Sequence, residues 1–248
     1  MCLKALNSNF KLTQTYIFTL ILLGIYIKKI PIINMTVKET LVENGAATKR
    51  ILFKSMELIM KNLQENMEHL NKPKYFEFTQ KFIDIVYEGI VNKRRFFLLA
   101  SGRSAFILQC FATRLVHLGA EIYMVTNLAS NPAIRKEDIL IVLSGSGTTP
   151  IVVSMLQTIV DSIRPKKIVS ITSHPETKVG QMGDITIKLI GRTKRDIIVE
   201  GDDRAILTPE GTAFEQVAFT YLDAIVAELA IRLGKTNEDL LKSHSETT

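Results

Sequence analysis

The segment 144–149 has the residue types and spacing needed to hold a small anion. It reads Ser-Gly-Ser-Gly-Thr-Thr, follows an apolar run at 139–143 typical of a buried strand, and precedes a helical pattern. Glycines let backbone N–H groups approach a ligand, hydroxyls add donors, and a helix N-terminus favours negative charge. The segment therefore predicts an oxyanion-binding loop, above all for a phosphate monoester. The alternative is that these residues only form a turn and a helix N-cap.

A second hydroxyl-containing loop, Ser-Gly-Arg-Ser at 101–104, also lies between a strand pattern and a helix pattern. The guanidinium of Arg103 could bind the phosphate or the hydroxyl groups of a sugar. Both loops together supply the residues that we expect to bind the substrate and its phosphate. These are Ser101, Gly102, Arg103, Ser104, Ser144, Gly145, Ser146, Gly147, Thr148 and Thr149.

Neither loop has the sequence of a familiar nucleotide-binding motif. A P-loop requires a lysine before its final Ser or Thr, and the 144–149 segment has none. A dinucleotide fingerprint requires a third glycine where this chain has Pro150. We therefore expect neither ATP nor NAD as a ligand.

One carboxylate and several histidines are further candidates for proton transfer. Glu215 lies in the first turn of a helix predicted at 212–233, beside its apolar stripe. Its spacing from Thr212 also fits a capping box, which is the alternative reading. His174 follows a predicted strand and is expected in a loop near the site, whereas His117 is expected to be a capping or core residue and His69 a surface residue.

The elements that must position these residues follow a regular alternation. Helical patterns fill residues 36–92, with a break at Asn71-Lys72-Pro73, and 191–207 is expected to be a surface loop or flap. Strands alternating with helices predict a mostly parallel five-stranded sheet covered on both faces, a three-layer α/β/α sandwich. Ligands bind beyond the carboxyl ends of such strands, where both loops fall. The predicted strands are 96–100, 121–125, 139–143, 167–172 and 185–189, and the helices between and after them are 106–118, 151–163 and 212–233.

Composition and charge restrict the class of protein. A chain of 248 residues is long enough for one large α/β domain with extensions. The net charge of +6 comes from scattered Lys and Arg, which favours capture of an anionic metabolite over binding of nucleic acid. The two cysteines form no Cys-x-x-Cys spacing, so we expect no disulfide framework, no metal site and a cytoplasmic location, with Cys110 a buried apolar residue.

Residues 1–35 form an apolar extension that differs from the remainder, which we expect to be a single domain at 36–248. The segment Tyr16–Ile27 is uncharged and apolar, yet shorter than the roughly 20 residues of a membrane helix. It lacks the small-residue cleavage site of a signal peptide. Three interpretations remain open: translation starting at Met35, a poorly packed extension, or a membrane anchor.

Three motifs occur in the order found in a known family: Ser-Gly-Arg-Ser at 101–104, Ser-Gly-Ser-Gly-Thr at 144–148, and Leu-Thr-Pro-x-Gly-Thr-x-Phe-Glu at 207–215. With the stretches at 114–119 and 222–228, they resemble the sugar isomerase (SIS) domain family, and within it the 6-phospho-3-hexuloisomerase group. The resemblance covers about residues 40–245. It implies a flavodoxin-like fold and the interconversion of D-arabino-3-hexulose 6-phosphate and D-fructose 6-phosphate, a step of the ribulose monophosphate pathway.

The resemblance also implies roles for particular residues. Glu215 would be the catalytic base, and His244 the acid, which a C-terminal tail could carry to the site of a neighbouring subunit. Such an isomerisation needs no cofactor and no obligatory metal. The apolar surface of the helices at 40–90 and 212–233 exceeds what the sheet can cover, so we expect a homodimer or homotetramer.

Two departures from the family pattern leave other functions open. Thr126–Asn131 replaces the family's usual Gly-Glu-Thr-Thr-Thr, and Lys242-Ser243-His244-Ser245-Glu246 replaces its Arg-His-Ala-Asn-Leu tail. Isomerisation of another phosphosugar is one alternative. A sugar-phosphate sensor is another, although residues 36–92 lack the compact basic three-helix pattern of a DNA-binding domain.

Overall fold

The structure is a computed structural model that describes residues 45–126, 131–191, 193–197, 207–236 and 238–239. The chain divides into two compact units, residues 1–53 and 54–248. The described part of the first unit, 45–53, is the beginning of helix α3 (Gly45–Leu70). The apolar extension at 1–35 lies outside the described residues, so the domain division predicted from the sequence stays a prediction.

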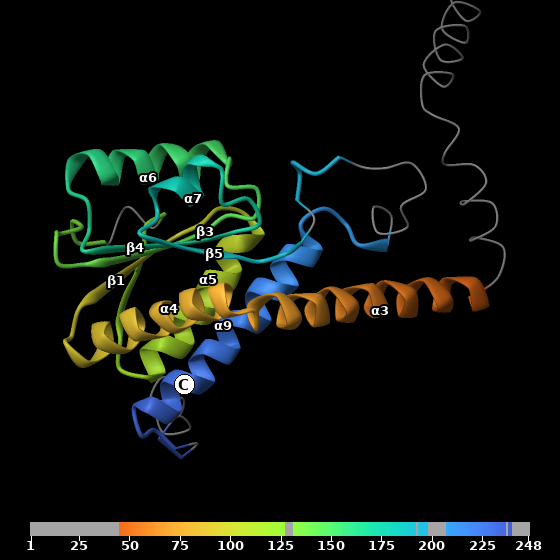
Figure 1. The fold of residues 1–248 in the computed structure, drawn as a ribbon, viewed down its shortest axis with the longest axis horizontal. Coiled ribbons are helices and arrows are strands. Elements are labelled where there is room, and N and C mark those ends of the chain that lie inside the picture. Colours follow the sequence, from red (N-terminus) through yellow and green to blue (C-terminus); the bar gives the residue numbers. More distant parts are fainter. Residues whose placement is uncertain (1–44, 127–130, 192, 198–206, 237, 240–248) are drawn as a thin grey trace, which may run out of the picture. The chain divides into compact units, whose positions relative to one another are not determined.

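The second unit contains a parallel five-stranded sheet in the order β2-β1-β3-β4-β5 (Figure 1). This is the strand order of flavodoxin-like proteins, and it confirms the predicted α/β fold. All five strands lie within one residue of the predicted ranges. They are β1 (Arg95–Leu99), β2 (Glu121–Met124), β3 (Ile139–Leu143), β4 (Lys167–Thr172) and β5 (Ile185–Lys188).

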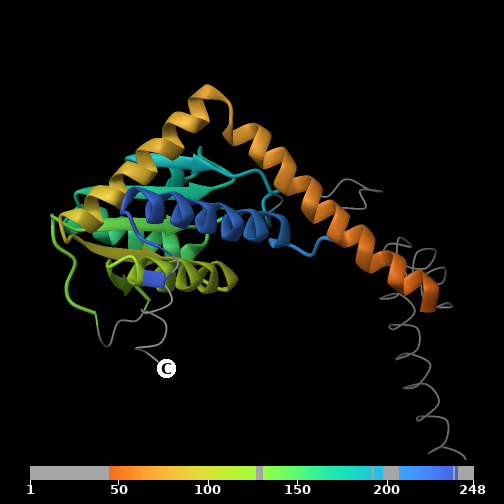
Figure 2. The same ribbon diagram turned by 90° about the horizontal axis from the view of Figure 1, so that it is seen from below.

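Helices cover both faces of the sheet, which explains why the central strands are continuous apolar runs. Every residue of β3 is buried, because its alternate side chains pack against helices on opposite faces. Helices α4, α5 and α9 lie on one face and α6 and α7 on the other (Figures 1 and 2). The helix bounds are α4 (Pro73–Val91), α5 (Arg103–His117), α6 (Pro150–Ser162), α7 (Lys178–Met182) and α9 (Thr212–Arg232).

Two local features differ from the predicted elements. Helix α5 begins at Arg103, because Gly102 adopts φ +61° as its N-cap and lets the next residue turn directly into the helix. The predicted 101–104 loop is therefore a short turn in which Arg103 and Ser104 are already helical. Helix α7 was not predicted, since five residues are too few to show a helical repeat.

The expectations for two other side chains are wrong. His69 is not a surface residue but 6% exposed, with its ring 3.8 Å from that of Tyr75. Cys110 is not buried: it faces outward from α5. In an amphipathic helix, a shift of one residue in the predicted stripe is enough to invert such an assignment.

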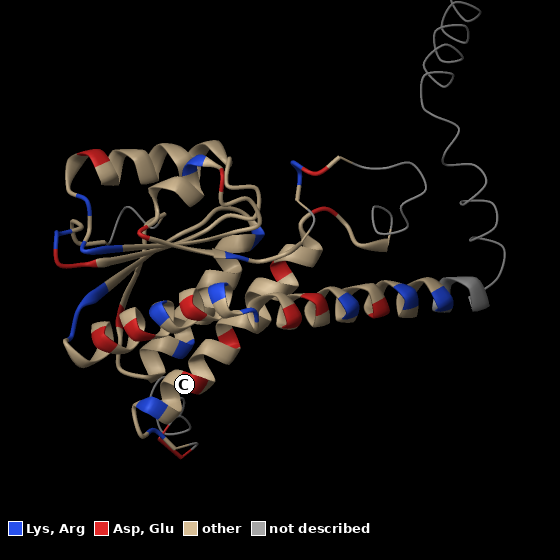
Figure 3. Cartoon of the chain, viewed as in Figure 1, with Lys and Arg blue, Asp and Glu red and all other residues tan. Residues whose placement is uncertain are grey.

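Residues of both charges are mixed along the helices. Basic and acidic residues are mixed along α3 (Figure 3), whereas α9 carries three acidic residues and one arginine near its end. An anion bound to this unit would therefore depend on local donors and not on a broad positive surface. In the described part of the chain, no helix is both long and apolar enough to cross a membrane.

Candidate functional site

The strand order places the two predicted loops side by side. Strands β1 and β3 are neighbours, and the helices that follow them, α5 and α6, cover opposite faces of the sheet. Such a point of reversal opens a crevice at the carboxyl ends of the strands, where ligands of open α/β sheets bind. The turn at 100–102 follows β1, and the loop at 144–149 follows β3. Both predicted binding segments therefore lie at the carboxyl ends of neighbouring strands.

The end of β4 fixes the backbone of the 144–149 loop. The Gly145 carbonyl accepts hydrogen bonds from the Ser173 N–H and from Thr172 Oγ1, both at 3.1 Å. Gly147 has φ +61°, and a Cβ added there would collide with Thr177 Oγ1. The loop is thus held in a single close-packed conformation that requires glycine.

Several donors of this loop have no protein partner among the described residues. The Ser144 hydroxyl is buried and without a hydrogen bond. The N–H groups of Gly145, Ser146 and Thr149 likewise donate to no described acceptor. A buried hydroxyl left unpaired costs about 1–3 kcal/mol, so a bound oxyanion that accepts these bonds would offset that cost. Backbone and hydroxyl donors at the start of α6 form an anion-binding geometry.

An ion pair links the first loop to the start of α9. Arg103 Nε lies 2.8 Å from Glu215 Oε2, although the N–H is not aligned for a hydrogen bond. The Arg103 side chain is 63% exposed, whereas that of Glu215 is 12% exposed. The exposed guanidinium can therefore move away from a carboxylate that stays in place.

Phe214, the residue before Glu215, packs α9 against the 144–149 loop. A Cβ on Gly145 would lie 2.8 Å from Cδ1 of Phe214, so the loop backbone packs directly on the Phe214 ring. Arg103, the 144–149 loop and Glu215, distant in the chain, are thus brought to one place. The structure shows this convergence; the roles predicted for these residues in catalysis and binding stay predictions.

Glu215 does not form the capping box that its spacing allowed. The N-cap of α9 is Gly211, with φ +83°, and no side chain caps the helix. Burial raises the pKa of the Glu215 carboxyl, and the positive charge of Arg103 lowers it by a smaller amount. A carboxyl whose pKa is raised by burial holds a proton more readily than an exposed one, which is a property of groups that accept and return protons.

The sequence did not predict the residues at the end of β4 that support the 144–149 loop. Thr172, Ser173 and Thr177 are buried hydroxyl residues that bond to or pack against this loop or the turn beside it. Their signal was present, because hydroxyls at the carboxyl end of a predicted strand face the same edge as the loop.

The histidine candidates are placed as follows. His174 Nε2 lies 2.9 Å from Thr193 Oγ1 and 3.6 Å from Asp196 Oδ2, so its ring bonds to the chain after β5 and not to the 144–149 loop. His117 lies in the last turn of α5, as expected. His244 lies outside the described residues, and its role as an acid stays a prediction.

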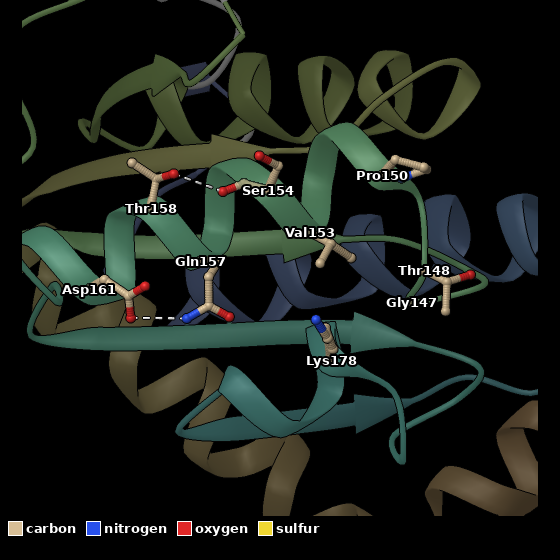
Figure 4. Close-up of a pocket in the computed structure, with 9 residues that line it drawn as sticks. All are labelled: Gly147, Thr148, Pro150, Val153, Ser154, Gln157, Thr158, Asp161 and Lys178. Atoms are coloured by element: carbon tan, nitrogen blue, oxygen red, sulfur yellow. Dashed lines mark hydrogen bonds between the residues drawn. The ribbon is translucent and has the colours of Figure 1, made fainter.

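Two hollows adjoin the loops. The first, of about 850 Å³, lies between α3 and the ends of β4 and β5 and is lined by Ser173, His174, Gly191 and Ala213, among others. The second, of about 580 Å³, runs along α6 from Gly147 and Thr148 (Figure 4). Lys178 of α7 points into it near Gln157, which donates to Asp161. Neither hollow is lined by Arg103 or Glu215.

These features define an open α/β protein, covered by helices on both faces, with a glycine- and hydroxyl-rich loop at the point of strand reversal. The chain belongs to the SIS domain family, whose model matches residues 89–200. A 3-hexulose-6-phosphate isomerase from Methanocaldococcus jannaschii is 30% identical over 193 residues, which are 75% of this chain and 90% of that protein. An uncharacterized protein of Methanothermobacter thermautotrophicus is 33% identical over 66% of this chain and 84% of its own length.

A solved structure supports the same assignment to the family. The crystal structure of a hypothetical protein from Methanococcus jannaschii superposes on this chain with a TM-score of 0.63. A molecular function of 3-hexulose-6-phosphate isomerase was inferred for that protein from its structure. It is 27% identical, and the match covers 77% of this chain and 97% of that one. The family and the fold expected from the sequence are therefore confirmed.

Proposed function

We propose that this protein is a phosphosugar isomerase that interconverts D-arabino-3-hexulose 6-phosphate and D-fructose 6-phosphate. The observation that carries the proposal is the convergence of Glu215, Arg103 and the 144–149 loop, through the Arg103–Glu215 ion pair and the packing of Phe214 on Gly145. An isomerase of this kind needs an anion anchor and a proton carrier held at a fixed distance from each other. The names of the relatives described above support the choice of substrate.

The reaction moves a carbonyl from C3 to C2 of the sugar. The Glu215 carboxylate removes the proton from C2, and the electron pair of the C–H bond forms the C2–C3 double bond of an enediolate. The proton on the C2 oxygen is lost and the C3 oxygen gains one, so that C2 becomes the carbonyl. Protonation of C3 by the Glu215 carboxyl completes the transfer, with no net change of oxidation state.

The remaining site residues would anchor and stabilise the substrate. The phosphate would accept hydrogen bonds from Ser144, Ser146 and the free N–H groups of the loop. The Arg103 guanidinium would leave Glu215 to bind an oxygen of the sugar or its phosphate. The enediolate carries negative charge that a nearby cation stabilises. Such an enzyme would act in the cytoplasm, as the cysteine content predicts.

The direct test is incubation of purified protein with D-arabino-3-hexulose 6-phosphate while fructose 6-phosphate formation is followed. We expect turnover at a rate typical of enzymes, roughly 1–10³ per second. The Glu215→Gln variant serves as the matched control. Turnover of only a different phosphosugar, such as a sedoheptulose or arabinose phosphate, would replace the substrate in this proposal. Binding of a sugar phosphate without any turnover would favour the sensor alternative.

A further inference from the structure

One face of α3 carries carboxamide side chains that bond to the backbone of the candidate site. Asn62 and Asn66 are four residues apart and therefore lie on the same side of the helix. Asn66 is 2% exposed, and Asn62 is partly buried. A carboxamide costs free energy to bury unless it is hydrogen-bonded, so the partners of these two groups define what the face does.

Asn66 pairs with both backbone groups of one residue just beyond β5. Its Nδ2 donates to the Ile190 carbonyl at 2.7 Å, and its Oδ1 accepts from the Ile190 N–H at 2.7 Å. The pairing replaces one rung of a β-ladder at the edge strand, beyond which the described residues form no further strand to satisfy Ile190. Asn66 thereby fixes the path of the chain as it leaves the sheet.

The next residue, Gly191, packs against the beginning of α9. Gly191 is packed so tightly that an added Cβ would lie 2.5 Å from Cα and N of Phe214. Its carbonyl accepts from Ser173 Oγ at 3.0 Å, which links it to the end of β4. The segment 190–191 is therefore wedged between Asn66 and the backbone that immediately precedes Glu215.

Asn62 bonds directly to the first turn of α9. Its Nδ2 donates to the Ala213 carbonyl at 3.1 Å, in the first turn of α9. Phe214 is thus flanked by two backbone segments, 213 and 191, each positioned through an asparagine of α3. Nearer the beginning of α3, the Ser55 hydroxyl donates a third hydrogen bond, to the Leu207 carbonyl at 2.5 Å.

We propose that Asn62 and Asn66 are positioning residues for Glu215, an inference that rests on the function proposed above. By fixing the first turn of α9 against the end of β5, they hold the Glu215 carboxylate at its distance from the 144–149 loop. Neither asparagine contacts that loop or Arg103 in the described part of the chain, so they act through the backbone of α9. A displacement of about 1 Å in a reacting group can lower a rate on the order of 100-fold.

The test compares Asn62→Ala and Asn66→Ala with Gln64→Ala, a control that removes an exposed carboxamide from the opposite side of α3. We expect the two asparagine variants to lower kcat about 10- to 100-fold, with KM changed less than about threefold because the phosphate loop is untouched. A loss of melting temperature with unchanged kcat, measured well below the transition, would reduce both residues to structural roles and overturn the proposal.

A second measurement does not depend on turnover. The pKa of the Glu215 carboxyl is followed by NMR in protein with ¹³C-labelled glutamate, its signal being assigned by its absence in Glu215→Gln. Since burial raises this pKa, a displaced and better hydrated carboxyl in Asn62→Ala should titrate at lower pH than in the parent and in Gln64→Ala. If the parent turns over no phosphosugar, the proposed function fails, and this shift still tests the positioning. An unchanged pKa in both asparagine variants contradicts it. If Asn66→Ala does not fold, Asn62→Ala alone decides.

Discussion

Arg103 and Glu215 form an ion pair of 2.8 Å in which one partner is exposed and the other is enclosed. Arg103 is the first residue of α5 and Glu215 lies in the first turn of α9, two helices on the same face of the sheet. Burial and the arginine have opposite effects on the pKa of the carboxyl, and burial is the larger. The pair therefore couples the ionisation of Glu215 to the position of an exposed side chain that a bound anion can attract.

The Arg103→Met variant should show this coupling in its dependence on pH. Without the guanidinium, the pKa of Glu215 rises further, because burial then acts unopposed. A base must be ionised to accept a proton, so the acid limb of the kcat/KM profile should move to higher pH. The same replacement at Arg114, an exposed residue of α5, is the control. A limb that stays in place in Arg103→Met would show that the pair has no influence on the ionisation that governs activity.

Removal of two loop hydroxyls should weaken substrate binding. A hydrogen bond to a charged group contributes about 1.5–3 kcal/mol, and each 1.4 kcal/mol corresponds to about tenfold in affinity. Ser144→Ala with Ser146→Ala should therefore raise KM by at least about 100-fold in steady-state assays. Ser162→Ala, an exposed hydroxyl at the end of α6, should leave KM unchanged. An unaltered KM in the double variant would rule out the loop as the phosphate anchor.

The sequence predicted the strands and the 144–149 loop because each depends on local pattern. Apolar runs bounded by Gly, Ser and Pro specify buried strands and turns without reference to the rest of the chain. The pairing of Arg103 with Glu215 depends instead on the crossing of α5 and α9, which no local pattern contains. The spacing of Thr212 and Glu215 even favoured a capping box. Gly211 takes the cap position because its positive φ starts the helix one residue earlier.

The role of α3 could not be predicted for the same reason. Its apolar repeat identified a helix, but Asn62, Asn66 and His69 occupy positions that a helical pattern assigns to solvent or to a helix end. Their partners are backbone groups of Ala213, Ile190 and Lys188, which lie more than a hundred residues later. Backbone groups carry no sequence signal, so only the folded chain reveals that these polar residues are inside.

Exposed methionines on one face of α3 predict that the protein self-associates. Met56, Met60 and Met67 recur on one face and are 49%, 57% and 66% exposed, and Phe76 at the start of α4 is 50% exposed. Apolar side chains gathered in this way are commonly covered by another chain. We expect a homodimer or homotetramer in light scattering at micromolar concentration. Met60→Glu with Met67→Glu should shift the mass toward the monomer while the circular dichroism spectrum stays helical. A parent protein that scatters as a monomer would contradict this expectation.

Burial of His69 should make stability depend on pH. Burial lowers its pKa from 6.5, and the positive charges of Lys188 and Lys72 lower it further. The unfolded chain then binds more protons than the folded one, so this contribution to stability is present above pH 6.5 and is lost as pH falls toward the folded-state pKa. The His69→Phe variant, which keeps a ring against Tyr75, should lose less melting temperature than the parent between about pH 7 and pH 5. Parallel melting curves for the two proteins over that range would show that His69 does not contribute.

Replacement of Glu215 by glutamine tests the proposed proton transfer most directly. Glutamine has nearly the same size and stays in the first turn of α9, but it cannot accept the proton from C2. A positioned acid–base group contributes about 10²–10⁴-fold to a rate, so kcat should fall by that order while KM for the phosphosugar changes little. The packing of Phe214 on Gly145 should persist, and the melting temperature should stay close to that of the parent. The parallel variant Glu210→Gln removes an exposed carboxylate just before the helix and should leave both constants unchanged. If Glu215→Gln keeps a near-normal kcat but melts several degrees lower, the carboxylate stabilises the pair with Arg103 and the base lies elsewhere, with His244 the next residue to replace.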